Sequence, residues 1–162
     1  DSRLRYLKIE NDEIKTTIYI ENKKKLFCII YCMNLIKILT AENENNIEIY
    51  NLLEKLFKIF ELDNWLVEFL YLELNILKSI GYDINFKDYV VDKNINGQTK
   101  YIVGSSQKII PNFLIDKNIS PENLKDIYNG FSIVGDFLDK TIIKPNNKNY
   151  PSSRNDFVNL LK

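Results

Sequence analysis

The sequence predicts a mainly α-helical protein: a helical bundle around a buried central helix, with a small β-hairpin or irregular insertion near residues 86–110. Three observations predict this fold class. Read as a helix, the stretch 64–81 is apolar almost all the way round, so neighbouring elements must wrap it. Most other apolar residues also recur at helical spacing. Only within 86–110 do two short runs flank a turn, as paired strands do.

The start of the chain gives the weakest pattern. Residues 3–9, RLRYLKI, alternate partly between apolar and polar side chains, which favours a strand or the end of one. Residues 10–20 fit a helix or a strand equally well. We interpret residues 10–162 as a single helical domain with a small β insertion at 86–110.

A helix is predicted to open at the lysine run 23–25 and to continue to about Thr40. Two interpretations of the lysine run stay open, namely a solvated helix entry or a contact with phosphate groups. Cations at this end of a helix oppose its dipole. Cys28 and Cys32 are four residues apart within the apolar run of this helix, so we expect two buried free thiols.

The next two helices are predicted to form an antiparallel hairpin. Residues 41–48, AENENNIE, are a polar connection with side chains that favour turns and caps. Residues 47–62 return to helical spacing with a broad apolar face. The central helix follows almost at once, so the two helices have only a short connection between them.

The central helix is predicted over 64–81. Asp63 or Asn64 is expected to cap its first turn with a side-chain oxygen, and Gly81 to take the left-handed conformation at its end. Glu68 and Glu73 interrupt an apolar run that is already too short for a membrane span. Glu73 is expected to accept hydrogen bonds from buried backbone groups or tyrosine hydroxyls. The apolar residues are Trp65, Leu66, Phe69, Leu70, Leu72, Leu74, Ile76, Leu77 and Ile80.

The β insertion is predicted from its turn. Residues 89–91 and 101–103 are rich in Tyr, Val and Ile, and they flank an Asn96-Gly97 pair that favours a tight hairpin. The following run 104–106, GSS, is interpreted as a plain turn. It lacks the glycine and lysine pattern of a phosphate-binding loop and no helix follows it.

Two helices are predicted after the insertion. The run SPE at 120–122 places a capping serine, a proline and a glutamate at the start of a helix that reaches about Asn129. Apolar spacing over 131–142 predicts the next helix, in which the small Gly135 allows close packing. Gly130 either separates these two helices or is carried through them.

A last helix is predicted to run through Leu161. Pro145 and the polar run after it stop the preceding helix. Ser153, followed by Asp156 three residues later, is interpreted as a capping box that opens the last helix.

The composition excludes several kinds of chemistry. The chain has no histidine, which rules out Ser-His-Asp and Cys-His systems and most zinc sites. Two cysteines without histidine do not make a metal site, so we expect no metal and no cofactor. Glu68 and Glu73 are five residues apart and point to different helix faces, which is poor geometry for a catalytic pair. We therefore expect no enzyme activity, and a reducing cytoplasm because no secretory signal is visible.

Several runs resemble the RecO recombination mediators. FLYLELNILKSIGYDINF, at 69–86, is similar to their leucine-rich helix that ends in glycine and an aromatic residue. GFSIVGDFLDKTIIKP, at 130–145, resembles their LTGxFLxRxxxxP segment, and PSSRNDFVNLL, at 151–161, resembles their closing PxARxRLVxLL. Residues 111–114, PNFL, look like the LPxFL that precedes these segments. A weaker likeness extends upstream to about residue 40.

This resemblance implies a fold and a function. Family members begin with an oligonucleotide/oligosaccharide-binding barrel, which is missing here, so the resemblance implies that residues 1–9 are the last strand of this barrel. Many members also carry a four-cysteine zinc module. The stretch 86–110 has no cysteine, so the metal is not implied. The implied function is DNA repair and recombination, in which the protein assists annealing of complementary strands and loading of the recombinase. The implied partners are single- and double-stranded DNA, RecR and the tail of the single-strand-binding protein, with no membrane.

Charge is unevenly distributed although it sums to zero. Residues 1–40, 41–86 and 87–162 carry net charges of +3, −6 and +3, so any DNA contact must use local patches at the two ends. The alternative for each cation is a solvated surface charge, and for Arg154 a buried ion pair. The candidates for DNA contact are Lys140, Lys144, Lys148 and Arg154, followed by Lys23, Lys24 and Lys25.

A second function stays open from the sequence. The acidic middle of the chain disfavours DNA there, while grooves between helices readily accept amphipathic or acidic tails. The alternative is therefore a helical protein–protein interaction module with no DNA binding of its own.

Overall fold

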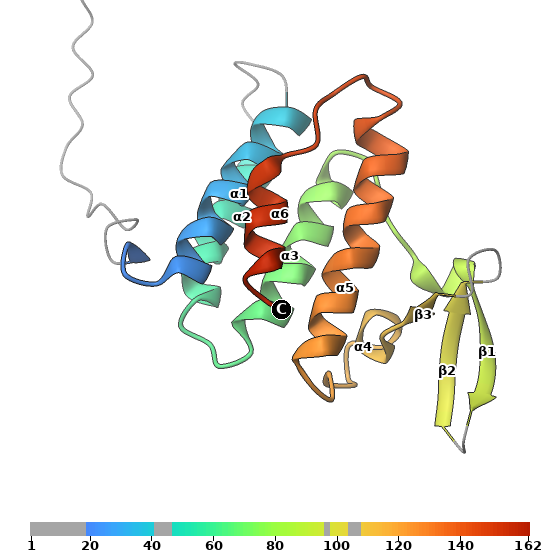
Figure 1. Cartoon of the computed structure of the whole chain (residues 1–162). Coiled ribbons are helices and arrows are strands. Elements are labelled where there is room, and N and C mark those ends of the chain that lie inside the picture. Colours follow the sequence, from blue (N-terminus) through green and yellow to red (C-terminus); the bar gives the residue numbers. More distant parts are fainter. Residues whose placement is uncertain (1–18, 41–46, 96–97, 104–107) are drawn as a thin grey trace, which may run out of the picture.

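The computed structural model describes residues 19–40, 47–95, 98–103 and 108–162, and Figure 1 shows their arrangement. The strand predicted at 3–9 lies outside the described residues, as do most of 10–20 and of the polar connection 41–48. The same holds for the Asn96-Gly97 turn and the run 104–106.

The described residues form a bundle of helices with a small sheet at one side, as the sequence predicts (Figure 1). The helix α6 lies against α1, α2 packs against α3, and α5 contacts both α3 and α6. The helices are α1 (Lys23–Leu39), α2 (Ile47–Ile59), α3 (Trp65–Ser79), the single turn α4 (Asn112–Ile115), α5 (Leu124–Phe137), the π-helix η3 (Leu138–Ile143) and α6 (Ser152–Asn159).

The central helix α3 is buried as predicted. Leu70 and Leu77 have no exposed surface, and Phe69 and Ile76 have almost none. Gly81 follows the helix with a φ of 95°, which is the left-handed conformation expected of a helix-ending glycine. A large apolar helix that faces other helices on nearly every side is stabilised by tertiary packing rather than by its own propensity.

The predicted cap of α3 is wrong. Asn64 stands at the N-cap, but its side-chain oxygen accepts no hydrogen bond from the first turn. Its amide Nδ2 instead donates to Glu68 Oε1 at 3.1 Å. The side chain therefore engages the carboxylate of the first turn rather than the backbone.

Two further helix starts also differ from the sequence-based expectation. The helix α5 begins at Leu124 instead of the SPE run at 120–122, because the Asn123 side chain accepts from the backbone N–H of Asp126 at 3.1 Å. It continues through Gly130, so of the two alternatives for this glycine the one in which it is carried through a helix is correct. The capping box at Ser153 is also wrong, since the Ser153 hydroxyl is buried and accepts from Asn34 Nδ2 at 3.0 Å.

The β insertion is a three-stranded antiparallel sheet with the order β1-β2-β3. The predicted hairpin is confirmed: β1 (Val90–Ile95) pairs with β2 (Gln98–Val103), with Val90 opposite Val103. The short 3₁₀ turn η2 (Phe86–Tyr89) precedes it, so Tyr89 lies before the first strand. The strand β3 (Ile109–Ile110) was not predicted, because two residues are too few to show alternation.

Both cysteines are buried and free, as predicted. Burial raises the pKa of the Cys28 thiol well above its ordinary value, and it raises that of Cys32 to about 12. Only the thiolate is an effective nucleophile.

The folded protein is therefore expected to resist alkylation of Cys28 and Cys32 by iodoacetamide at pH 9, whereas both thiols react quickly in denaturant. Rapid labelling of the native protein at both sites would contradict the packing of α1.

Candidate functional site

A cluster of polar side chains lies inside the bundle, where α1, α3 and α6 meet. It is formed by Tyr31, Glu73 and Arg154, all of which are almost completely shielded from solvent. Arg154 Nε donates to Glu73 Oε1 at 3.1 Å, and Nη2 donates to Oε2 at 3.3 Å. The Tyr31 hydroxyl also donates to Glu73 Oε1, at 2.5 Å. The two-point contact between Arg154 and Glu73 is the geometry in which guanidinium–carboxylate pairs are strong and specific.

Arg154 has further partners, on α5 and just before α6. Its Nη2 donates to the carbonyl oxygen of Phe131 at 2.7 Å, and its Nη1 donates to the Tyr150 hydroxyl at 3.1 Å. Burial by itself lowers the pKa of Arg154, but the neighbouring Glu73 carboxylate outweighs it and raises that pKa. Burial and then the charge of Glu73 raise the pKa of Tyr31 well above its ordinary value. The arginine thus stays charged and the tyrosine stays protonated at neutral pH.

Gly135 makes room for this guanidinium. A Cβ at position 135 would lie 2.3 Å from Arg154 Nη1 and 2.8 Å from the Tyr150 hydroxyl oxygen, which is closer than real contacts allow. The runs GFSIVGDFL and PSSRNDFV, in which the family resemblance is most specific, therefore meet in space. Their glycine and their arginine are explained by packing between α5 and α6.

The structure thus corrects the assignment of Arg154 as a DNA contact. Its side chain is 3% exposed and its donors are used inside the protein, so the alternative of a buried ion pair is the correct one. The expectation that Glu73 accepts from a tyrosine hydroxyl is confirmed by Tyr31. Sequence reasoning missed the roles of Tyr31 and Tyr150. One signal did exist, because a carboxylate in an otherwise apolar helix requires a buried donor.

Lys25 is half-buried, and its ammonium group contacts other parts of the protein. Its Nζ donates to the carbonyl oxygen of Phe60, just after α2, at 2.5 Å. The same ammonium lies 5.6 Å from the ring centroid of Tyr19, 5.8 Å from that of Phe60 and 5.9 Å from that of Trp65. A cation among three aromatic rings that also satisfies a helix-end carbonyl stabilises the start of α1.

The other lysines that were predicted to contact DNA lie at two separate places on the structure. Lys23 is exposed and Lys24 half-buried at the beginning of α1, whereas Lys140, Lys144 and Lys148 are exposed on or just after η3. These two places are at opposite ends of the bundle in Figure 1. The structure therefore does not bring the two lysine groups into a single surface.

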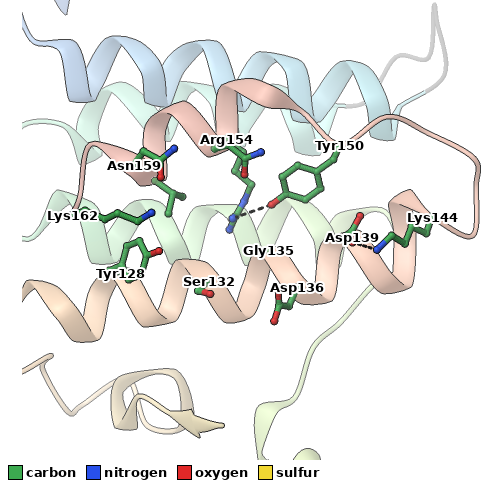
Figure 2. Close-up of a pocket in the computed structure, with 12 residues that line it drawn as sticks. Tyr128, Ser132, Gly135, Asp136, Asp139, Lys144, Tyr150, Arg154, Asn159 and Lys162 are labelled. Atoms are coloured by element: carbon green, nitrogen blue, oxygen red, sulfur yellow. Dashed lines mark hydrogen bonds and ion pairs between the residues drawn. The ribbon is translucent and has the colours of Figure 1, made fainter. Parts of the chain in front are cut away.

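A groove of about 550 Å³ lies between α5 and α6. Figure 2 shows Tyr128 and Lys162 at one end, with Tyr150, Asp139 and Lys144 toward the other. The Lys144 ammonium pairs with Asp139 Oδ2 at 2.5 Å, and Lys162 Nζ lies 5.6 Å from the ring centroid of Tyr128. The groove is thus lined by charges of both signs.

A smaller, more apolar pocket of about 410 Å³ lies at the C-terminal ends of α1 and α3. Half of its lining residues are aliphatic, and Lys148 supplies its one cationic side chain. It is lined by Ile38, Leu39, Thr40, Ile80, Tyr82, Ile142, Asn146 and Lys148.

Neither metal binding nor membrane insertion finds support in the described residues. They contain no group of three or more Cys, Asp or Glu side chains placed to hold a metal ion. None of the helices that the structure describes has the length and apolar character needed to cross a bilayer.

Comparison with known proteins gives two matches. The family described as recombination protein O C terminal matches residues 21–126. A DNA repair protein RecO from Ehrlichia chaffeensis is 29% identical over 101 residues, which cover 60% of this chain and 41% of that protein. The chain thus spans about two-fifths of the length of this relative. No solved structure matches. Since the family match covers well over half of the sequence, this chain belongs to the RecO C-terminal family.

Proposed function

We propose that this chain is the helical portion of a RecO-type protein that acts in DNA repair and recombination. The observation that carries the proposal is the family match over residues 21–126. The proposed role is not catalytic, because the protein would hold strands and partners in place without making or breaking covalent bonds. Within that role, the chain would assist annealing of complementary strands and loading of the recombinase together with RecR.

The proposed DNA contacts are phosphate contacts by exposed lysines. Lys140, Lys144 and Lys148 follow one another at intervals of four residues on or just after η3, and all three face solvent. Lys23 and Lys24 form a second, smaller candidate at the beginning of α1. Lysine neutralises phosphates and displaces counterions, so binding of this kind weakens steeply with salt. Stacking on aromatic side chains belongs to barrel domains of nucleic-acid-binding proteins, so we expect the helical portion alone to bind weakly.

A charge-matched triple substitution tests these contacts. Lys140, Lys144 and Lys148 are changed to glutamine together, and binding of fluorescein-labelled oligothymidylate is measured over a series of salt concentrations. The slope of log K against log salt is expected to fall by about 2, since each lost contact to a single strand contributes roughly 0.7.

The matched control removes three other exposed lysines: Lys37, Lys55 and Lys58. This control has the same net charge and should keep most of the affinity and slope of the parent. Equal losses in both triple variants would mean that the affinity reflects net charge alone. Absence of binding by the parent at low salt, even with a barrel domain supplied, would overturn the DNA contact.

The second candidate is a module that binds protein and not DNA. The apolar pocket at the ends of α1 and α3, with Lys148 as its cation, fits an apolar side chain that carries a nearby carboxylate. The tail of the single-strand-binding protein would be such a ligand. Binding of that tail peptide to a chain with no DNA affinity favours this candidate, and loss of peptide binding in Ile80→Asp would place the peptide in the pocket.

A further inference from the structure

The π-helix η3 brings Asp139 and Lys144 together. In an α-helix, residues five apart point to different faces. In η3 the backbone N–H of Lys144 donates to the carbonyl oxygen of Asp139 at 2.9 Å, which is the i to i+5 hydrogen bond of a π-turn. The wider turn sets the two side chains one above the other, and the Lys144 ammonium pairs with Asp139 Oδ2 at 2.5 Å.

The two partners of this ion pair differ in their exposure. The Lys144 side chain is 70% exposed, whereas that of Asp139 is 27% exposed. Asp139 lines the groove between α5 and α6. Figure 2 shows Lys144 reaching back along η3 toward this carboxylate. The Lys144 ammonium can thus contact a second anion from solvent, while the Asp139 carboxylate stays fixed in the wall of the groove.

We propose that Asp139 is an internal competitor for the phosphate group that Lys144 would bind, and so limits the affinity of this surface for nucleic acid. The inference rests on the proposed contact of Lys140, Lys144 and Lys148 with DNA. An isolated anion gains little by replacing a carboxylate that is already in place. A nucleic-acid strand presents several phosphates at once, and its contacts with Lys140 and Lys148 offset the loss of the Asp139 pair. The Asp139 pair therefore disfavours binding of isolated anions more than binding of a nucleic-acid strand.

The test is a comparison of Asp139→Asn with Asp156→Asn. Both substitutions raise the net charge by one, but Asp156 is exposed on α6 and lies outside the set of residues that line the groove. Binding of fluorescein-labelled oligothymidylate by the 162-residue chain is measured at low salt, with each substitution made in the parent and in a Lys144→Gln background. Asp139→Asn is expected to tighten binding about three- to fivefold, which is the upper part of the range for an exposed ion pair, while Asp156→Asn changes it less than about twofold.

The Lys144→Gln background provides the decisive comparison. Without the lysine, Asp139→Asn should act no more strongly than Asp156→Asn. Equal effects of the two asparagine variants in the parent would overturn the inference while leaving the proposed function intact. A persisting larger effect of Asp139→Asn in the Lys144→Gln background would overturn it as well, since the effect would not pass through Lys144. Absence of binding by every variant at low salt, even with a barrel domain supplied, would instead overturn the proposed DNA contact, and this inference with it.

Discussion

Replacement of Glu73 by alanine is expected to lower the free energy of unfolding by about 3–5 kcal/mol. The substitution leaves the Arg154 guanidinium buried without its counter-charge, and it also removes the acceptor of the Tyr31 hydroxyl. The cost of such an unpaired buried charge is larger than the net contribution of the pair itself. The measurement is chemical denaturation followed by circular dichroism, and it requires no activity.

Glu68 provides the control on the same helix. Its carboxylate is half-exposed and accepts from the Asn64 side chain, which is itself exposed. Glu68→Ala should therefore change the free energy of unfolding by less than about 1 kcal/mol. A Glu73→Ala variant as stable as Glu68→Ala would show that position 73 is not buried as described.

Replacement of Gly135 by alanine is expected to destabilise the fold by about 2–3 kcal/mol, although alanine normally favours a helix interior by roughly 1 kcal/mol over glycine. The new methyl group would meet Arg154 Nη1 at 2.3 Å and Cζ at 2.9 Å. That guanidinium cannot move aside easily, because it donates to both Glu73 and the carbonyl oxygen of Phe131. The midpoint of thermal or chemical unfolding reports the change.

Gly130 is the matched control, since it lies in the same helix. A Cβ there would approach Leu70 Cδ2 at 2.8 Å and Phe113 Cζ at 2.9 Å, which are the ends of side chains. These two carbon atoms form no hydrogen bonds and can shift, whereas the guanidinium is held by Glu73 and by the carbonyl oxygen of Phe131, so Gly130→Ala should be the milder substitution. A Gly135→Ala variant no less stable than Gly130→Ala would contradict the fit between α5 and α6.

The helices that the sequence predicted correctly are those with a long, regular apolar pattern. The central helix and its terminal Gly81 follow from spacing and from the conformational freedom of glycine. The helix starts were less predictable, because several capping residues stood close together. Asn123, rather than Ser120, caps α5, and a choice between such neighbours depends on tertiary packing.

Only one member of the buried cluster, Glu73, could be predicted from the sequence. Glu73 within an apolar helix indicated a buried acceptor, but its partner Arg154 lies 81 residues further along the chain. Nothing local connects the two positions. One signal favoured a special role for Arg154, since it is one of three arginines in a chain with 19 lysines. Arginine is the cation best suited to a buried two-point ion pair.

The exposure of individual lysines could not be predicted from spacing at all. Lys25 and its neighbours at 23 and 24 form one run in the sequence, yet only Lys25 donates to Phe60 and lies among aromatic rings. Its position depends on where α2 ends and α3 begins, which the lysine run itself does not encode. A basic run therefore contains structural and solvated lysines side by side.

The ion pair between Glu73 and Arg154 holds the last helix against the central one, and a double-mutant cycle tests this most directly. Glu73→Gln, Arg154→Met and the double variant are compared with the parent by urea denaturation. Either single substitution leaves the partner side chain buried and unpaired. The double variant should therefore lose much less stability than the sum of the single losses, with a coupling energy of at least about 2 kcal/mol. Losses that add within about 0.5 kcal/mol would show that the two side chains do not depend on each other, and would contradict the pairing of α3 with α6.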